Sequence, residues 1–149
     1  MREVLKHMEQ TRKRELQKIA NRIRQGVLEA TFSAQSGHPG GSLSISDTLA
    51  YLYFEQMNLD PSNPKCEERD RLVLSKGHCC PALYTALAEK GYFDKSELKG
   101  FRRIGAMLQG HPDMKNIPGV DMSSGSLGQG ISAACGMALA AKLSGKNWK

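Results

Sequence analysis

The sequence predicts an α/β fold that is incomplete and mostly helical, with one or two short strands. Apolar residues recur at three- and four-residue spacing in several stretches of the 149 residues, which is typical of helices. The clearest strand candidate is the apolar run Leu72-Val73-Leu74. Because a sheet of so few strands cannot close a core, we expect residues 1–149 to be the amino-terminal portion of a single larger domain, with residues 1–10 frayed.

Two helices are predicted before residue 60. Residues 11–31 carry their apolar side chains on one helical face. A second helix is predicted at about 45–57, because Ser44 and Asp47 have the spacing of a capping box. The proline-containing segment 60–64 ends this helix.

The middle of the chain predicts a strand, a polar loop and two further helices. The strand at 72–74 delivers the loop 75–78 at its carboxyl end, which is where α/β folds bind ligands. A helix over 81–90 is closed by Gly91, and a shorter helix over 94–100 carries acidic residues in its first turn.

The last third of the chain contains a long segment without periodicity and a final helix. Residues 102–126 form the first of these, and loops of that length in a compact domain are usually functional or disordered. Because this segment contains His111, we interpret it as functional. The final helix, about 127–144, is rich in Ala and Gly, which allows close packing, and Gly145 caps it.

The composition is that of an ordinary globular protein, 40% hydrophobic and 24% charged, with a formal net charge of +6. Residues 1–24 hold most of that charge, with eight Lys or Arg against three Glu. A basic segment can bind nucleic acid. Since no aromatic residue alternates with these cations, we favour a solvated helix face and keep a nucleic-acid-binding module as the alternative.

The cysteines and apolar segments indicate a cytoplasmic protein. Cys66, Cys79, Cys80 and Cys135 form no CxxC pair and lack metal-ligand spacing. No apolar signal segment is visible at the amino terminus, so reduced thiols are expected. The longest apolar stretch, 131–143, is short for a membrane span and contains a lysine, so no membrane association is expected.

Three of the four histidines directly follow a glycine in small polar loops, which we name the His38 loop (36–41), the His78 loop (75–78) and the His111 loop (108–113). A preceding glycine lets the backbone turn sharply and removes the side chain that would crowd a ligand. The three imidazoles are therefore the candidate catalytic groups. They lie in separate loops without short spacing, so nothing predicts that they bind a metal.

A fourth loop, the Gly125 loop (123–130), opens the final helix. The first N–H groups of a helix lack partners within it, so they are placed to face an anion. Alternatively, the glycines of the Gly125 loop only allow the start of the helix to pack closely against its neighbours. Three presented imidazoles and one helix start suited to an anion predict a polar catalytic site.

These four loops resemble those of the transketolases, thiamine-diphosphate enzymes of sugar-phosphate metabolism. The segments Gly40-Gly41-Ser42-Leu43-Ser44, Leu74-Ser75-Lys76-Gly77-His78 and 123–130 are most similar to the separate amino-terminal subunit of split transketolases. The resemblance runs from about residue 15 to 145, with the motifs in order. It implies a thiamine-diphosphate-binding fold and transfer of a two-carbon ketol unit from a ketose phosphate to an aldose phosphate.

The resemblance also implies roles for individual residues. His38 matches the histidine that faces the sugar substrate, and His111 matches the one beside the reacting hydroxyl and carbonyl of the donor. His78 matches the histidine that contacts the cofactor's diphosphate, so it is both a catalytic and a cofactor-binding candidate. Gly125-Ser126-Leu127 matches the loop that holds the cofactor, with serine where many transketolases have proline.

The resemblance implies a metal ion, Mg²⁺ or Ca²⁺, for which this chain is assigned no ligand. The Gly-Asp-Gly aspartate and the later asparagine that hold the metal in the family are expected beyond Lys149. The glutamate that activates the cofactor and the residues that bind the sugar phosphate are also implied to lie elsewhere. We therefore expect the chain alone to be inactive and to require a carboxyl-terminal transketolase half, within a homo-oligomer.

Three alternatives stay open on the sequence alone. A related thiamine-diphosphate enzyme, such as a deoxyxylulose-phosphate synthase, shares the implied fold but is expected to lack the glycine-histidine-proline motifs at His38 and His111. The second alternative is a non-catalytic remnant that only pairs with a partner chain. The third is the basic nucleic-acid-binding module.

Overall fold

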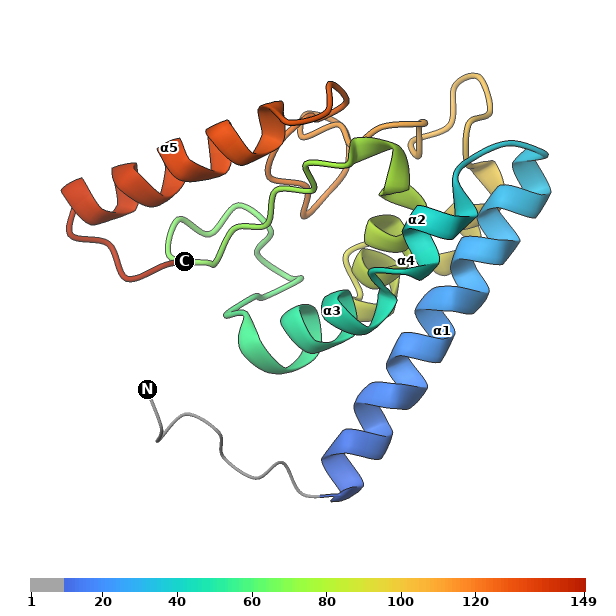
Figure 1. Ribbon diagram of the computed structural model, residues 1–149, viewed down its shortest axis with the longest axis horizontal. Helices are drawn as coiled ribbons and strands as arrows, with labels where there is room; N and C mark the ends of the chain where they lie inside the picture. The colour runs from blue at the N-terminus through green and yellow to red at the C-terminus, as the bar shows by residue number, and fades with distance from the viewer. Residues whose placement is uncertain (1–9) are drawn as a thin grey trace.

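The computed structural model of the chain describes residues 10–149. In chain order its elements are α1 (Gln10–Ala34), α2 (Pro39–Leu43), α3 (Ser46–Tyr51), η1 (Leu52–Gln56), η2 (Gly77–Cys79), α4 (Cys80–Lys90), η3 (Lys95–Gly100) and α5 (Gln129–Leu143). The long α1 runs along one side of the molecule, and α5 stands on the opposite side (Figure 1). The segment expected to be frayed, 1–10, lies outside the described residues except for Gln10.

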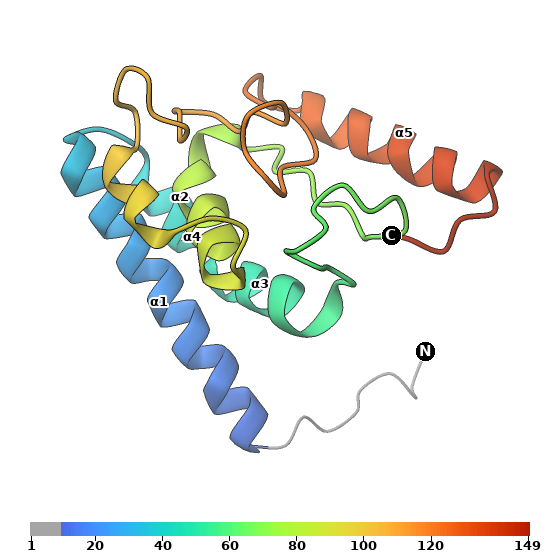
Figure 2. The same ribbon diagram turned by 180° about the vertical axis from the view of Figure 1, so that it is seen from behind.

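Helix α4 forms the centre of the core, because every residue from Cys80 to Ala88 is buried. A helix that is buried all round requires neighbours on every side. Helix α1 covers one side with an apolar stripe that includes Ile19, Ile23 and Val27. Helices α2 and α3 and the 3₁₀ helix η3 also pack against α4, which lies between these elements when viewed from behind (Figure 2).

The predicted helices 11–31, 81–90 and 94–100 are confirmed as α1, α4 and η3. Helix α4 ends where predicted because Gly91 adopts a φ of 100°, a conformation open to glycine at little cost. The helix η3 begins after Asp94, whose carboxylate accepts a hydrogen bond of 2.8 Å from the backbone N–H two residues later. Local signals at the helix ends were sufficient for these elements.

The helix predicted at 45–57 is confirmed over residues 46–56, but it differs from the prediction in two respects. The segment forms α3 followed by the π-helical turn η1, and the capping box is absent. The Ser44 hydroxyl donates to the carbonyl oxygen of Gly41 at 2.9 Å, while Asp47 forms an ion pair with Arg24 of α1. The Asp47 carboxylate, which the local pattern assigned to the helix cap, therefore pairs with Arg24 of another helix.

The strand predicted at 72–74 is wrong, and the described part of the chain contains no strand. Backbone groups of this segment pair with side chains instead of a neighbouring strand. The Leu72 N–H donates to Oδ2 of Asp121 at 2.8 Å, and the Leu74 carbonyl oxygen accepts from Ser124 Oγ at 2.7 Å. The described residues are therefore helices and loops, and they lack the sheet of the predicted α/β class.

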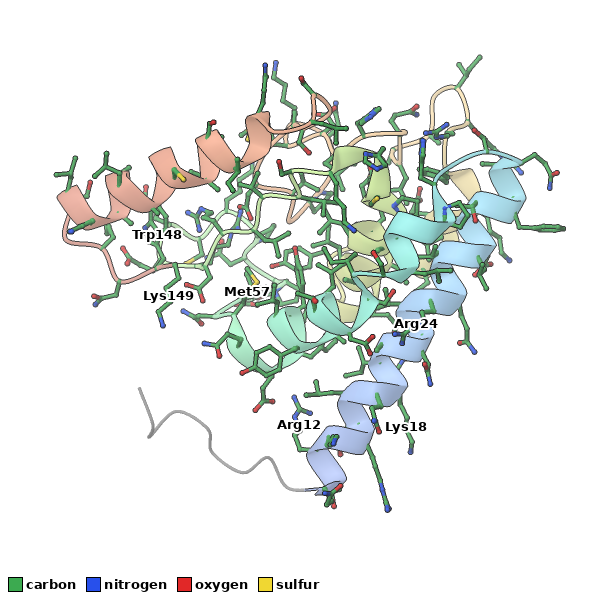
Figure 3. The ribbon with its side chains drawn as sticks, viewed as in Figure 1. Arg12, Lys18, Arg24, Met57, Trp148 and Lys149 are labelled. Carbon is green, nitrogen blue, oxygen red and sulfur yellow. The ribbon has the colours of Figure 1, made fainter. Side chains whose placement is uncertain are left out.

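A buried ion pair anchors the chain just before the His78 loop. The Arg69 guanidinium pairs with the Asp121 carboxylate, and the two side chains are only 10% and 2% exposed. Arg71 lies 3.8 Å from the same carboxylate and stacks over the ring of Trp148, which Figure 3 labels near the end of the chain. The pair thus ties the residues before the His78 loop to the residues before the Gly125 loop.

Helix α5 confirms the helix predicted at 127–144, but it is not closely packed along its length. Only Gly130 and Ala141 are buried, whereas Ile131 and Leu143 are 63% and 79% exposed. Neither α5 nor another helix in the described part of the chain combines the length and the apolar character needed to span a bilayer.

Candidate active site

The His38 and His78 loops bring two imidazoles into contact. Their ring centroids are 4.9 Å apart, and the ring planes meet at 72°. His38 directly precedes α2, and His78 lies in η2 at the amino-terminal end of α4. His38 is exposed and His78 is half-buried, so both rings are accessible to a ligand.

Glycines allow the loops to approach one another closely. A methyl group at Gly41 would lie 2.5 Å from Cys79 Sγ, and one at Gly77 would lie 2.7 Å from the carbonyl oxygen of Ser124. Carbon atoms do not tolerate such distances, so these positions require residues without a Cβ. A methyl group at Gly40, in contrast, would meet no other atom within 4 Å.

Side chains of α4 fix the backbone of the His111 loop. The Tyr84 hydroxyl donates to the carbonyl oxygen of His111 at 2.8 Å, and Cys80 Sγ donates to that of Gly110 at 3.1 Å. Burial raises the pKa of Tyr84 and raises that of Cys80 to about 12, so both stay protonated donors at neutral pH. The exposed His111 ring lies against Gly125, where a methyl group would be 3.4 Å from Cδ2 of the ring.

The Gly125 loop leads directly into the amino terminus of α5. Gly128 precedes the helix with a φ of 87°, and no side chain caps the helix. The first N–H groups of α5 therefore keep the partial positive charge of the helix dipole. Ser126 and Leu127 are exposed beside them, so Gly125-Ser126-Leu127 and the helix start fit an anionic group.

The structure brings all four predicted loops together as two pairs. The His38 and His78 loops meet through their imidazoles, and the His111 loop meets the Gly125 loop. The close approach of Gly77 to Ser124 joins the two pairs.

Two cations that sequence reasoning did not select link these loops. Lys76 Nζ donates to the carbonyl oxygen of Gly41 at 2.7 Å and to Ser44 Oγ at 3.1 Å. Arg102 Nη1 donates to Ser36 Oγ at 2.8 Å. The place of Lys76 inside a glycine-histidine motif was a usable signal, whereas Arg102 lies in a segment without any pattern.

Arg102 adopts a strained backbone conformation to make this link. Its φ of 62° lies in the left-handed region, which residues other than glycine rarely adopt. Its N–H donates to the Leu108 carbonyl oxygen at 2.8 Å, and its guanidinium lies where a side chain at Gly110 would project. Nε of Arg102 is buried without a hydrogen-bond partner. The residue therefore spans the distance between the His38 and His111 loops.

The four loops, which together we call the loop cluster, are electropositive because they meet at Lys76 and Arg102. Neither Lys76 nor Arg102 forms an ion pair with a carboxylate of the described residues. Asp113 of the His111 loop stabilises its own turn, because its carboxylate accepts from the Lys115 N–H at 2.9 Å and from Asn116 Nδ2 at 2.5 Å. These hydrogen bonds lower the pKa of Asp113. Lys76 and Arg102 therefore donate to oxygen atoms of the loops and to no carboxylate of the described residues.

The cysteines near the site are packing residues. All four cysteines of the chain are free thiols in the structure. Burial raises the pKa of Cys79 and of Cys80, so neither is a thiolate at neutral pH. Cys79 and Cys80 are small and fully buried beneath the loops, as expected of residues that pack the core.

Three of the six cations of α1 form ion pairs within the chain. Arg12 pairs with Glu55 at 2.8 Å, Arg22 pairs with Glu89 at 2.8 Å, and Arg24 pairs with a carboxylate of α3. Arg12 and Arg24 are labelled along α1 in Figure 3. Guanidinium groups already paired with carboxylates form a poor surface for phosphates, so these three arginines do not favour the nucleic-acid-binding alternative.

Comparison with known proteins shows similarity to transketolases and their subunits. The family described as transketolase, thiamine diphosphate binding domain, matches residues 15–148. The chain is 57% identical over 129 residues to the 6-deoxy-6-sulfo-D-fructose transketolase subunit SqwG of Clostridium sp. (strain MSTE9), covering 87% of this chain and 47% of that protein. It is 42% identical over 135 residues to an apulose-4-phosphate transketolase subunit of Phocaeicola vulgatus, covering 91% of this chain and 47% of that protein.

Solved structures show the same relationship. Transketolase from Leishmania mexicana superposes with a TM-score of 0.81 at 39% identity, covering 84% of this chain and 19% of that one. The chain spans about half the length of the two subunit relatives and about a fifth of this single-chain enzyme. The chain belongs to the family of transketolase amino-terminal, thiamine diphosphate binding domains.

Proposed function

We propose that this chain is the amino-terminal part of a transketolase subunit, which transfers a two-carbon ketol unit from a ketose to an aldose with thiamine diphosphate. The meeting of the four loops carries the proposal: the His38 and His78 rings are in contact, and His111 lies beside Gly125 just before α5. A deoxyxylulose-phosphate synthase is not favoured, because the relatives described above are transketolases or their subunits.

We assign the diphosphate of the cofactor to Gly125-Ser126-Leu127 and the start of α5, with His78 as a further contact. The absence of a side chain at Gly125 leaves the backbone open beside His111. N–H groups at a helix start that no side chain caps favour a phosphate group. When bound, the cofactor supplies a nucleophilic carbon and stores the negative charge that develops during the reaction.

We assign proton transfer at the sugar oxygens to His38 and His111. Histidine is the side chain that most often transfers protons in general acid–base catalysis. Both rings are exposed, and Tyr84 holds the backbone of the His111 loop in place. His78 contacts the His38 ring and limits how far that ring can turn.

A divalent metal, Mg²⁺ or Ca²⁺, would take its ligands from other residues of the full subunit. The described residues contain no group of three or more His, Cys, Asp or Glu able to hold a metal ion. No step assigned to this chain depends on the metal.

We propose that the ketose donor carries an anionic group, a sulfonate or a phosphate. Two relatives are named for 6-deoxy-6-sulfo-D-fructose and for apulose 4-phosphate. We further propose that a carboxyl-terminal transketolase subunit completes the enzyme, that the assembly is a cytoplasmic homo-oligomer, and that the complete domain is α/β.

The test uses the full-length subunit with its carboxyl-terminal partner, thiamine diphosphate and Mg²⁺. Xylulose 5-phosphate and 6-deoxy-6-sulfo-D-fructose serve as donors for an aldose phosphate acceptor, and mass spectrometry follows the products. We expect a ketose two carbons longer than the acceptor, and no product from the 149-residue chain alone. Product from pyruvate as donor, with no transfer from either ketose, would identify a synthase instead.

A further inference from the structure

The His38 loop is held at both ends by cations from other segments. At its start, Ser36 Oγ accepts a hydrogen bond of 2.8 Å from Arg102. At its end, the carbonyl oxygen of Gly41 accepts one of 2.7 Å from Lys76 Nζ. His38 lies between these two attachment points.

The loop has little stability of its own. Three of its six residues are glycine, and glycine loses more conformational freedom on ordering than any other residue. The following helix α2, at five residues, is far shorter than a helix that persists unaided. His38 does not cap this helix through its side chain. Ser42 Oγ donates to the His38 carbonyl oxygen at 2.9 Å, and contacts from other segments add to this local restraint.

Both cations are engaged in this region. The second hydrogen bond of Lys76 goes to Ser44 Oγ, directly after α2, at 3.1 Å. No carboxylate of the described residues competes for either cation through an ion pair. Hydrogen bonds from charged donors are stronger than those between neutral groups, so each link restrains the loop effectively.

Each cation also connects His38 to another imidazole. Lys76 belongs to the same loop as His78, so its hydrogen bond to Gly41 links the two loops whose rings are in contact. Arg102 lies against Gly110, the residue before His111. The strained φ of Arg102 and its unpartnered Nε show that the fold tolerates a local cost at this position.

We propose that Lys76 and Arg102 form a brace that positions His38 relative to His78 and to the His111 loop. Both are positioning residues, because they act through the loop that carries His38. The catalytic consequence rests on the proposed function, whereas the ordering of the loop does not. Since a misplacement of about 1 Å can cost on the order of 100-fold in rate, the brace is expected to matter for turnover.

The experiment compares Lys76→Met, Arg102→Gln and the double variant in the full-length subunit with its partner. Arg103→Gln is the matched control, since Arg103 is an exposed neighbour whose side chain makes no hydrogen bond or ion pair with the described residues. Arg102→Lys tests rescue by a conservative change. Ser36→Ala removes only the acceptor and keeps the test valid if an arginine variant fails to fold.

Hydrogen exchange measured by mass spectrometry gives the first readout, independent of activity. In each brace variant the amides of 36–44 are expected to exchange about 10-fold faster, as local opening becomes easier. The second readout is kinetic, with kcat reduced roughly 10- to 100-fold and the donor KM changed much less. The double variant is expected to lose little more than either single variant, because one release already frees the loop.

The outcomes separate the two proposals. Faster exchange at 36–44 together with a lower kcat, partly restored in Arg102→Lys, supports the brace. Exchange and kcat equal to those of Arg103→Gln in all brace variants would overturn it. Faster exchange in the brace variants of an enzyme whose wild type transfers no ketol unit would uphold the brace and contradict the proposed function.

Discussion

The imidazoles of His38 and His78 meet nearly at a right angle, with ring centroids 4.9 Å apart, although forty residues separate them in the sequence. This contact places the residue assigned to the sugar beside the residue assigned to the diphosphate. A ligand that occupies one position therefore lies next to the other. The third imidazole lies on the His111 loop, which is held by hydrogen bonds from Tyr84 and Cys80. Its role can therefore be tested separately from those of His38 and His78.

Replacing His111 by Ala in the full-length enzyme is expected to lower kcat by roughly 10²–10⁴, because a proton-transfer group is removed. The affinity for thiamine diphosphate is expected to change far less, since the assigned cofactor contacts are largely backbone groups. Steady-state kinetics and a separate cofactor titration measure the two effects. Arg103→Gln serves as the control. Unchanged turnover in His111→Ala would contradict the assignment of proton transfer to His111.

Two glycine substitutions are expected to have opposite effects on stability. At Gly77, a Cβ would lie 2.7 Å from a backbone oxygen of Ser124, so Gly77→Ala should cost about 1–3 kcal/mol through overpacking. At Gly136, in α5, a Cβ meets no atom within 4 Å, so Gly136→Ala should add about 0.5–1 kcal/mol. Urea unfolding of the full-length subunit compares the pair. Equal stability of the two variants would contradict the close approach of the loops.

The buried and exposed ion pairs are expected to differ in strength. Removing Asp121 leaves the guanidinium of Arg69 buried without its partner, so Asp121→Ala should cost about 3–5 kcal/mol. Asp47 is 68% exposed in its pair with Arg24, so Asp47→Ala should cost about 0–1 kcal/mol. The measurement is the free energy of unfolding in urea. A loss below that of Asp47→Ala would refute the anchoring role of Asp121.

The buried thiol of Cys80 is expected to make stability fall at alkaline pH. An unfolded thiol ionises with a pKa near 8.5, whereas burial raises the pKa of folded Cys80 to about 12. Between these values the unfolded state binds fewer protons than the folded state, so stability decreases as pH rises, by at most about 1.4 kcal/mol per pH unit for this group. Unfolding free energies from about pH 8 to 10 should show a shallower decrease in Cys80→Ala. If stability falls with pH equally in the wild-type protein and in Cys80→Ala, the Cys80 thiol is not the cause of the decrease.

The sequence predicted what depends on short-range signals. The ends of α4 and η3 were located from Gly91 and from the acidic start after Asp94, because caps act within one turn. The glycine-histidine motifs located three of the four loops for a similar reason. The candidate site was therefore largely visible in the sequence, as far as its loops are concerned.

Contacts between distant residues explain what the sequence did not predict. The backbone of Leu72 pairs with Asp121, 49 positions away, and this long-range bond replaces the strand that the apolar run indicated. The link from Arg102 to Ser36 spans 66 positions and leaves no local pattern. A composition rich in Ala and Gly predicted close packing of α5, whereas exposure depends on which neighbours surround the helix.

The difference between Gly40 and Gly41 has a practical consequence for engineering the substrate range. A side chain at position 40 would project into open space two residues after His38, whereas one at position 41 would strike Cys79 Sγ. Libraries that vary position 40 and keep position 41 fixed would change the surface offered to a sugar without displacing the loop. One step along the backbone thus separates a variable position from an invariable one.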